Sequence, residues 1–185
     1  MAQKKKPEKK SGEGLDRRWH LANTAFEIEV TEAEYSLMRA YEGFGRWQQE
    51  CLGSVIEHAL SGPENALLHI IRMHDRAKSI KDLAWMTNRD DIPNIQYSLR
   101  KLIKAGLVRR SGSGRAGVTY SATERGVAVT DHYANVRKSL LVQALSNVPD
   151  FDTRLSEAAR TFELLTGIYE QVARIAATHR RVKRD

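Results

Sequence analysis

The sequence predicts a mostly helical protein with one small β-hairpin, and three patterns support this fold class. Apolar residues recur every three or four positions over several long stretches, as they do on the buried side of a helix. Capping-box patterns, with a Ser or Thr three positions before a Glu, mark helix starts at Thr31–Glu34 and Ser121–Glu124. The run SGSGRAG separates two short segments that are typical of strands.

Length and composition limit the chain to one domain with tails. The 185 residues are 41% hydrophobic, which is enough for one sizeable core but hardly for two full domains. No apolar run approaches the ~20 residues of a membrane span, and the start MAQKKKPEKK lacks the apolar stretch of a secretory signal. We therefore expect a soluble, cytoplasmic protein with no membrane partner. Cys51 is the only cysteine, which excludes an intramolecular disulfide, and no metal site or cofactor is expected.

The net charge of +7 lies in the two tails. The first ten residues hold five lysines and one glutamate, and the last seven hold four basic residues and one aspartate, so the tails account for the whole excess. Basic tails are common as solubilising or disordered ends. The overall charge is therefore weak evidence for nucleic-acid binding, and local charge has to decide.

The N-terminal part of the chain predicts a tail and a long helix. Residues 1–18 are expected to form a flexible basic tail, because Lys, Glu, Ser and Gly dominate them. Residues 19–60 form an N-terminal segment and a first dimerisation helix. The segment up to Val30 lacks a helical period and is predicted to be extended, and the helix is predicted to begin at Thr31 and to keep an apolar stripe as far as Leu60.

Residues 61–121 are predicted to hold three short helices and the hairpin. Pro63 opens a helix that runs to about Asp75, and Ser79 caps a second helix of about two turns. A third helix begins near Ile92 and ends at Gly106, and its inward positions are Ile95, Leu99, Leu102 and Ile103. Strands at 107–110 and 118–121 then form the hairpin.

Residues 122–178 predict two long C-terminal helices, and residues 179–185 a second basic tail. Apolar stripes run from Val129 to Leu145 and from Leu155 to Ile175. Helices of this length expose more apolar surface than a small core covers. We therefore expect them to pair with the first helix and with a second subunit, as C-terminal dimerisation helices.

The order of the elements between 61 and 121 is that of a winged helix-turn-helix, in which one helix enters the major groove of DNA and the hairpin reaches the backbone. Local charge agrees with this order. Between Pro93 and Thr123 there is no Asp or Glu, and six basic residues stand there: Arg100, Lys101, Lys104, Arg109, Arg110 and Arg115. The sequence thus predicts binding to double-stranded DNA.

Side-chain chemistry assigns roles within this module. Asn and Gln can pair with adenine, Arg with guanine, and Lys with phosphate. Helical geometry turns several polar residues outward. The residues predicted to face bases are Asn94, Gln96, Tyr97 and Arg100, and those predicted to face phosphates are Lys101 and Arg109.

The run LRKLIKAGLVRR over Leu99–Arg110, a loop with Gly and Arg, and the run SATERG over Ser121–Gly126 together resemble the MarR (multiple-antibiotic-resistance regulator) family. The resemblance implies a bacterial transcriptional regulator, a homodimer with interlocked first and last helices on a pseudo-palindromic operator. It also implies that Arg115 enters the minor groove. The family's Asp two positions earlier is Ser113 here, so the brace of the wing differs.

Many MarR-type proteins respond to a small, often aromatic or phenolic, effector, and the resemblance implies such a ligand here. The candidate lining residues are Trp19, His20, Trp47 and His69. Each has a simpler interpretation, because a Trp on a long helix usually packs in the core and a lone His usually has no special function. Cys51 could in principle sense oxidants, but its apolar neighbours favour a buried structural thiol.

Other classes of function have less support. No residues group as nucleophile, base and oxyanion donor, and SGSGRAG lacks the Lys-Ser/Thr end of a P-loop, so we do not expect an enzyme. RNA binding is disfavoured because only Tyr97 and Tyr120 offer stacking surfaces near the wing. The main alternative is a winged helix used as a protein–protein interaction module without specific DNA binding.

Overall fold

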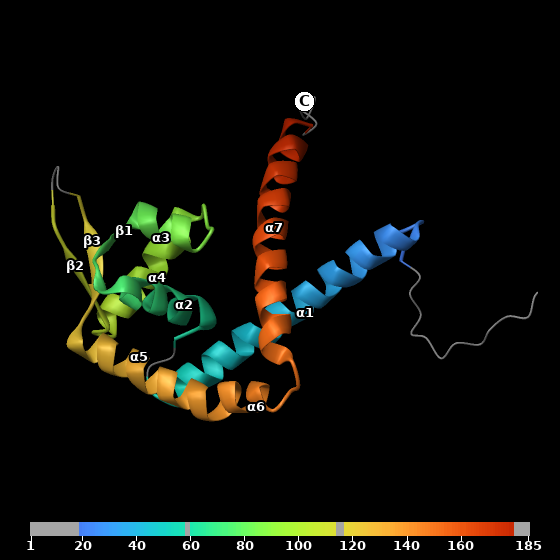
Figure 1. Ribbon diagram of the computed structural model, residues 1–185. Coiled ribbons are helices and arrows are strands. Elements are labelled where there is room, and N and C mark those ends of the chain that lie inside the picture. Colours follow the sequence, from blue (N-terminus) through green and yellow to red (C-terminus); the bar gives the residue numbers. More distant parts are fainter. Residues whose placement is uncertain (1–18, 58–59, 114–116, 180–185) are drawn as a thin grey trace, which may run out of the picture.

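A computed structural model describes residues 19–57, 60–113 and 117–179 of the chain (Figure 1). The predicted tail over 1–18, most of the tail over 179–185, and Arg115 lie outside these ranges. The predicted fold class, mostly helical with a small hairpin, is confirmed. In chain order the elements are α1 (Ala25–Gly53), α2 (Gly62–Arg72), β1 (Lys78–Ser79), α3 (Ile80–Met86), α4 (Ile92–Lys104), β2 (Val108–Ser111), β3 (Thr119–Ala122), α5 (Glu124–Arg137), α6 (Gln143–Ser146) and α7 (Phe151–Thr178).

Helix α1 begins earlier than its sequence pattern indicated. Thr24 is the N-cap, and it forms a capping box with Glu27: the Thr24 hydroxyl accepts from the Glu27 amide at 3.2 Å, and the Glu27 carboxylate accepts from the Thr24 amide at 3.1 Å. The prediction of an extended segment up to Val30 was therefore wrong. Thr31, the predicted cap, lies inside the helix, where its buried hydroxyl donates to the Glu27 carbonyl at 2.8 Å.

The same helix also ends earlier than predicted. It stops at Gly53, and the Ser54 amide caps it by donating to the Glu50 carbonyl. Leu60, where the predicted apolar stripe ends, follows the helix and still enters the core. Apolar residues after Gly53 are thus explained by burial in the core, and they do not extend the helix.

The winged domain, which is the predicted winged helix-turn-helix over residues 61–121, contains a sheet of three antiparallel strands in the order β1-β3-β2. Strand β1 was not predicted, because two residues carry no periodicity. Its Lys78 is buried, and the amine donates to the carbonyls of Ile71 at 3.1 Å and Arg76 at 3.0 Å. The amine also donates to the Met73 carbonyl, so that it satisfies carbonyls at the end of α2 and in the turn that follows. A cationic side chain thus replaces a C-terminal glycine cap at this helix end.

The N-cap of the helix after the hairpin was predicted two residues too early, at Ser121. Ser121 belongs to β3, and the N-cap of α5 is Thr123, whose hydroxyl accepts from the Gly126 amide at 3.0 Å and donates to the Gly106 carbonyl at 2.7 Å. Gly106 itself has a φ of +71°, as expected of a glycine that ends α4. Helix α5 continues through a π-helical turn over Lys138–Val142 into α6.

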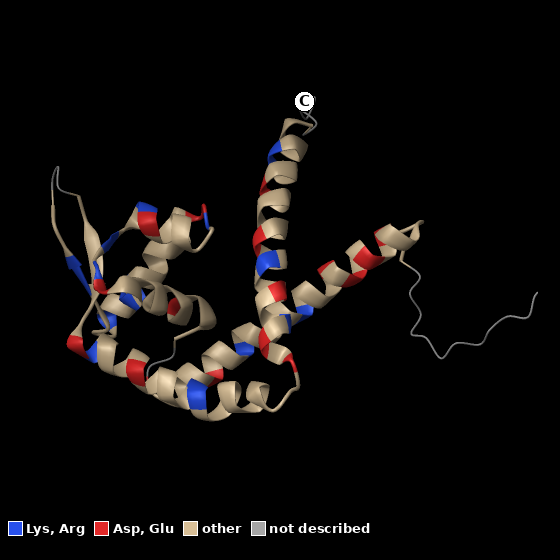
Figure 2. Ribbon diagram, in the orientation of Figure 1, with Lys and Arg blue, Asp and Glu red and all other residues tan. Residues whose placement is uncertain are grey.

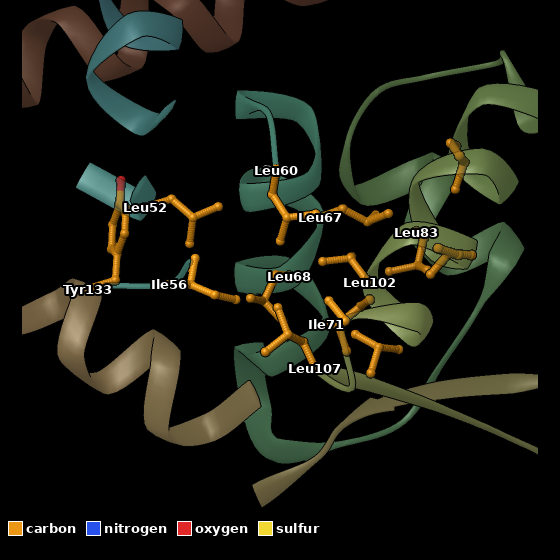
Figure 3. Packing of buried hydrophobic residues seen from close by; sticks show 14 of the residues in the cluster. Leu52, Ile56, Leu60, Leu67, Leu68, Ile71, Leu83, Leu102, Leu107 and Tyr133 are labelled. Atoms are coloured by element: carbon orange, nitrogen blue, oxygen red, sulfur yellow. The ribbon is translucent and has the colours of Figure 1, made fainter. Parts of the chain in front are cut away.

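The core lies inside the winged domain and at its junction with α1 and α5 (Figure 3). Leu67, Leu68 and Ile71 of α2 stand at its centre, with Leu52 of α1 and Tyr133 of α5 on the outer side. Each is at most 5% exposed. Helix α2 is therefore the element that ties the winged domain to the long helices.

Helices α1 and α7 extend away from this core and cross one another (Figure 1). No residue of α7 is buried, and a hydrogen bond from the Tyr169 hydroxyl to the Glu34 carboxylate, 3.2 Å long, connects it to α1. Large apolar side chains stand exposed along both helices, among them Phe26, Tyr41, Phe44, Phe162, Leu164 and Val172. Within the described residues, no helix combines the length and the apolarity needed to cross a membrane.

Candidate nucleic-acid interface

The candidate interface centres on the outer side of α4. Ile95, Leu99 and Leu102 point into the core as predicted, but Ile103 is 37% exposed and Ser98 is buried in its place. The prediction that Ile103 faces inward was wrong, because a step of 100° per residue carries position 103 away from the stripe that 95 and 102 define. The inward side of α4 thus carries one polar group.

Four side chains occupy the middle of the outer side of α4: Pro93, Tyr97, Arg100 and Lys104, all exposed. Helical geometry places Gln96 on one flank of this row, and Asn94 and Lys101 on the other flank. Of the residues predicted to face bases, Tyr97 and Arg100 therefore stand at the centre. Lys104, which the sequence analysis left without a role, stands beside them.

Lys101 is held by an acidic partner. Its amine lies 2.8 Å from a carboxylate oxygen of Glu64 on α2, and its side chain is 32% exposed. The same amine lies 5.7 Å from the centre of the Tyr97 ring. The side chain predicted to contact phosphate is thus turned toward α2.

Glu64 is the buried acid of the interface. Only 3% of it is exposed, and its carboxylate accepts from the Ser61 amide at 2.8 Å, the Ser98 hydroxyl at 3.0 Å and the Lys101 amine at 2.8 Å. Burial by itself raises the pKa of Glu64, but the hydrogen bonds from Lys101, Ser61 and Ser98 outweigh it, so that the pKa is lowered. Glu64 was not predicted as a site residue, although Ser61 and Glu64 have the spacing of a capping box.

Asn94 is engaged at the start of α4. Its amide donates to a carboxylate oxygen of Asp91, the N-cap, at 3.0 Å. Asp91 also accepts two hydrogen bonds from the Arg89 guanidinium, each 2.8 Å long. The bonds from Arg89 and Asn94 hold the pKa of Asp91 at about 2. This bidentate pair braces the turn that leads into α4.

The wing carries two arginines on opposite faces. Arg109 pairs with Ser121 in the β2–β3 register, and its guanidinium donates to the Ser121 hydroxyl at 2.9 Å. Arg110 pairs with Tyr120 and is exposed. Gly112 has a φ of +84°, and a Cβ on it would overlap the carbonyl of Gly117. The hairpin therefore needs glycine where it narrows toward its tip.

Basic and acidic residues gather on different elements at two places in the molecule, although α7 carries both signs (Figure 2). From Ile92 to Ser111 the chain has five basic residues and no acid. Asp and Glu gather instead on the free end of α1 (Figure 2). The positive potential is thus concentrated on α4 and the wing.

The structure places two of the four residues predicted to line an effector pocket at the start of α1 and the other two beside the core. Trp19 and His20 lie near the free end of α1, where the Trp19 indole donates to Glu32 at 2.9 Å. Trp47 packs against the core, and the His69 ring lies 4.5 Å from that of Tyr133. Burial, together with the charge of Arg137, lowers the pKa of His69.

A cavity of about 750 Å³ lies between α1, the start of α2 and the turn before α4, and none of those four residues lines it. Its walls include Tyr41 and Phe44 of α1, Ala66 and Ile70 of α2, and Arg89 of the turn. Apolar rings and an arginine therefore share one concave surface next to the recognition helix.

Cys51 and the acidic and histidine side chains offer little further chemistry. Cys51 is buried, its Sγ lies 4.0 Å from the Tyr133 carbonyl, and burial raises the pKa of its thiol. These features agree with a structural thiol. Among the residues that the structure describes, no three potential metal ligands cluster together.

Residues 60–126 match the family model of the winged helix DNA-binding domain. Solved structures with a similar fold include a MarR family transcriptional regulator from Streptomyces coelicolor, which is 12% identical with a TM-score of 0.63 over 77% of this chain and 98% of that chain. Staphylococcus aureus MarR, solved in complex with salicylate and kanamycin, is 14% identical with a TM-score of 0.63 over 79% and 95% of the two chains.

The M. tuberculosis transcriptional regulator MosR, solved in complex with DNA, is 17% identical with a TM-score of 0.58 over 74% of this chain and 97% of that chain. At these identities the likeness establishes a shared fold. Among proteins of curated function, none matches the chain in sequence.

Proposed function

Because the chain has the winged-helix fold of the MarR-family transcriptional regulators, as the run Leu99–Arg110 predicted, we propose that it is a sequence-specific DNA-binding regulator. The observation that carries this proposal is the outer side of α4, where Tyr97, Arg100 and Lys104 stand together in a stretch without acids. This is the side-chain set that a reader of the major groove needs. The match of residues 60–126 to a winged helix DNA-binding domain supports the same function.

The roles follow from position on α4 and the wing. Helix α4 enters the major groove, with base edges read by Tyr97 and Arg100 at the centre of its outer side and by Gln96 and Asn94 from the two flanks. Lys104 and Arg109 contact phosphates. Arg115 reaches the minor groove, an assignment that rests on the resemblance to the family.

We expect Arg100→Ala to lower affinity for the specific site about ten- to a hundredfold at fixed salt, because an Arg paired with guanine contributes ~1–3 kcal/mol of discrimination. The measurement is a titration of the variant with a duplex selected from a random pool by the wild-type protein. Lys138→Ala is the matched control. Lys138 is exposed on the π-helical turn after α5, and its substitution also removes one positive charge. An Arg100 variant that bound as the Lys138 variant does would contradict the assignment.

The proposed regulator is a homodimer on a pseudo-palindromic operator. Support comes from the apolar side chains that stand exposed on α7 and α1, including Leu164, Ile168 and Tyr41. A protomer alone leaves this surface in water, which monomeric proteins avoid. A second copy that covered α7 would also place two recognition helices on one duplex.

The alternative, a protein–protein interaction module, is favoured by Trp85 of α3, which is 83% exposed. Exposed Trp residues are enriched among the side chains that dominate protein–protein binding. The two functions differ in their response to salt, because DNA binding that neutralises several phosphates weakens steeply as salt is raised. Absent or salt-insensitive DNA binding would favour the protein–protein interaction module over the DNA-binding regulator.

We further propose that the cavity between α1 and α2 takes a small aromatic or phenolic effector. Tyr41 and Phe44 offer ring surfaces, and Arg46, together with the part of the Arg89 guanidinium that does not bond Asp91, offers a partner for an acidic or phenolic group. A volume of about 750 Å³ is within the range of small-molecule sites. Staphylococcus aureus MarR is a fold relative that was solved with salicylate.

Salicylate is therefore the probe for the cavity. We expect salicylate to raise the melting temperature of the wild-type protein, because a ligand that binds the folded state stabilises it. We also expect salicylate to weaken DNA binding. Ala66→Phe, which fills the cavity, should abolish both effects. Ala128→Phe, on the exposed side of α5, should preserve them. Equal responses of the two variants would place the binding elsewhere.

A further inference from the structure

One buried carboxylate joins α2 to the recognition helix. The Glu64 oxygens are shared between the Ser61 amide, which begins the same helix, and two groups of α4, the Ser98 hydroxyl and the Lys101 amine. The charge of Glu64 also contributes to the raised pKa of Arg89, after the larger effect of Asp91. The charged groups that the structure shows interacting with this carboxylate are thus Lys101 of α4 and Arg89 of the turn before it.

The contact extends to the outer side of α4. Lys101 stands between Glu64 and the Tyr97 ring, at 2.8 Å from the carboxylate oxygen and 5.7 Å from the ring centre. Ser98 adds a second tie one turn earlier, at 3.0 Å. Hydrogen bonds from one carboxylate to residues in two successive turns restrict the rotation of α4 about its own axis. Any such rotation would stretch at least one of the two hydrogen bonds.

Lys101 is therefore not available as a simple phosphate contact. A phosphate that engaged its amine would have to displace a carboxylate that is itself 3% exposed and accepts three further hydrogen bonds, from the Ser61 amide, the Ser61 hydroxyl and the Ser98 hydroxyl. Leaving a buried carboxylate without its cation is unfavourable. The pair with Glu64 is thus favoured over a solvated phosphate.

We propose that Glu64 is a positioning residue of the recognition helix, which sets the rotation of α4 and keeps Lys101 away from the DNA backbone. This inference rests on the proposed DNA-binding function. Glu64 favours specific over nonspecific binding in two ways: it orients Tyr97 and Arg100 toward base edges, and it removes one lysine from the sequence-independent attraction to phosphates.

The test is the salt dependence of binding to a specific and a nonspecific duplex. Each phosphate that a protein neutralises adds about 0.9 to the slope of log affinity against log salt. In Glu64→Gln the amine of Lys101 is released, so we expect the nonspecific slope to steepen by about 0.9 and nonspecific affinity to rise. Specific affinity should fall about fivefold or more, because the base contacts lose their alignment.

Three further variants separate positioning from general damage. Lys101→Met should leave the slope unchanged, whereas Lys104→Met, in the middle of the outer side, should reduce it by about 0.9. The double variant Glu64→Gln/Lys101→Met should return the slope to the wild-type value. A loss of fold would lower both kinds of binding together and would not steepen the slope.

Two results would overturn the inference: a wild-type slope and specificity ratio in Glu64→Gln, or a slope reduced in Lys101→Met as much as in Lys104→Met. Failure of the proposed function looks different, because the wild-type protein itself would then show no salt-dependent DNA binding. Thermal unfolding of Lys101→Met checks that its fold is intact.

Discussion

Gly126→Ala is expected to lower the free energy of unfolding by about 3 kcal/mol and to abolish DNA binding at physiological temperature. Gly126 is buried in the first turn of α5, and a Cβ placed on it would overlap the carbonyl oxygen of Leu107. That carbonyl is backbone and already accepts from the Thr123 amide at 3.0 Å. It cannot turn aside as a flexible side chain would, so α5 must move away from the wing.

The displacement would reach the recognition helix through a short path. The Thr123 hydroxyl that caps Gly126 also donates to the Gly106 carbonyl, directly after α4. A shift of α5 therefore strains the ends of α4 and β2 together. Unfolding by urea, followed by circular dichroism and by tryptophan fluorescence, measures the loss.

Gly53→Ala is the matched control for this substitution. A Cβ on Gly53, the last residue of α1, meets no atom within 4 Å. Alanine also narrows the unfolded ensemble, so we expect this variant to be as stable as the wild-type protein or more stable by up to ~1 kcal/mol. If Gly126→Ala unfolded at the same urea concentration as Gly53→Ala, the close contact with Leu107 would not be real.

The second large effect concerns assembly. The double variant Leu164→Asp/Ile168→Asp is expected to convert the protein from a dimer to a monomer. It should also reduce affinity for a two-half-site operator about a hundredfold or more, because two linked recognition helices gain this much over one. Leu164 is 65% exposed in the protomer, so a charge there costs the protomer little. Its cost arises only where a second copy covers the position.

Sedimentation equilibrium gives the oligomeric state, and titration with full and half operators gives the two affinities. Ser156→Asp/Gly167→Asp adds the same charge to α7, but helical geometry places both positions on its polar side. This control should remain dimeric. A wild-type protein that sediments as a monomer, or a Leu164/Ile168 variant that stays dimeric, would rule out α7 as the dimer interface.

Much of the winged domain could be predicted because its signals are local. Ser79 with Asp82 caps α3, Gly106 ends α4, and the stripe of Ile95, Leu99 and Leu102 defines the inward side of α4. Each of these features depends on residues within about two turns of one another, where periodicity and capping rules apply directly.

Helix starts were mispredicted where two capping residues competed. Thr24 and Thr31 both precede a Glu by three positions, and Thr24 is the cap. Ser121 also precedes a Glu by three positions, yet it pairs with Arg109 in the sheet. Helix α5 therefore has Thr123 as its N-cap. A capping-box pattern shows which side chains could accept hydrogen bonds from backbone amides, and packing at the neighbouring strand or helix decides which box forms.

The sequence by itself determined the order of the main helices and the two hairpin strands, the basic stretch from Ile92 to Ser111 and the residue types on the outer side of α4. Only the tertiary structure decided which of those side chains are free. It holds Lys101 against Glu64 and forms the cavity between α1 and α2. The physical reason is distance along the chain: Glu64 and Lys101 are 37 positions apart, and no local period or charge count reports which groups the fold brings within 3 Å.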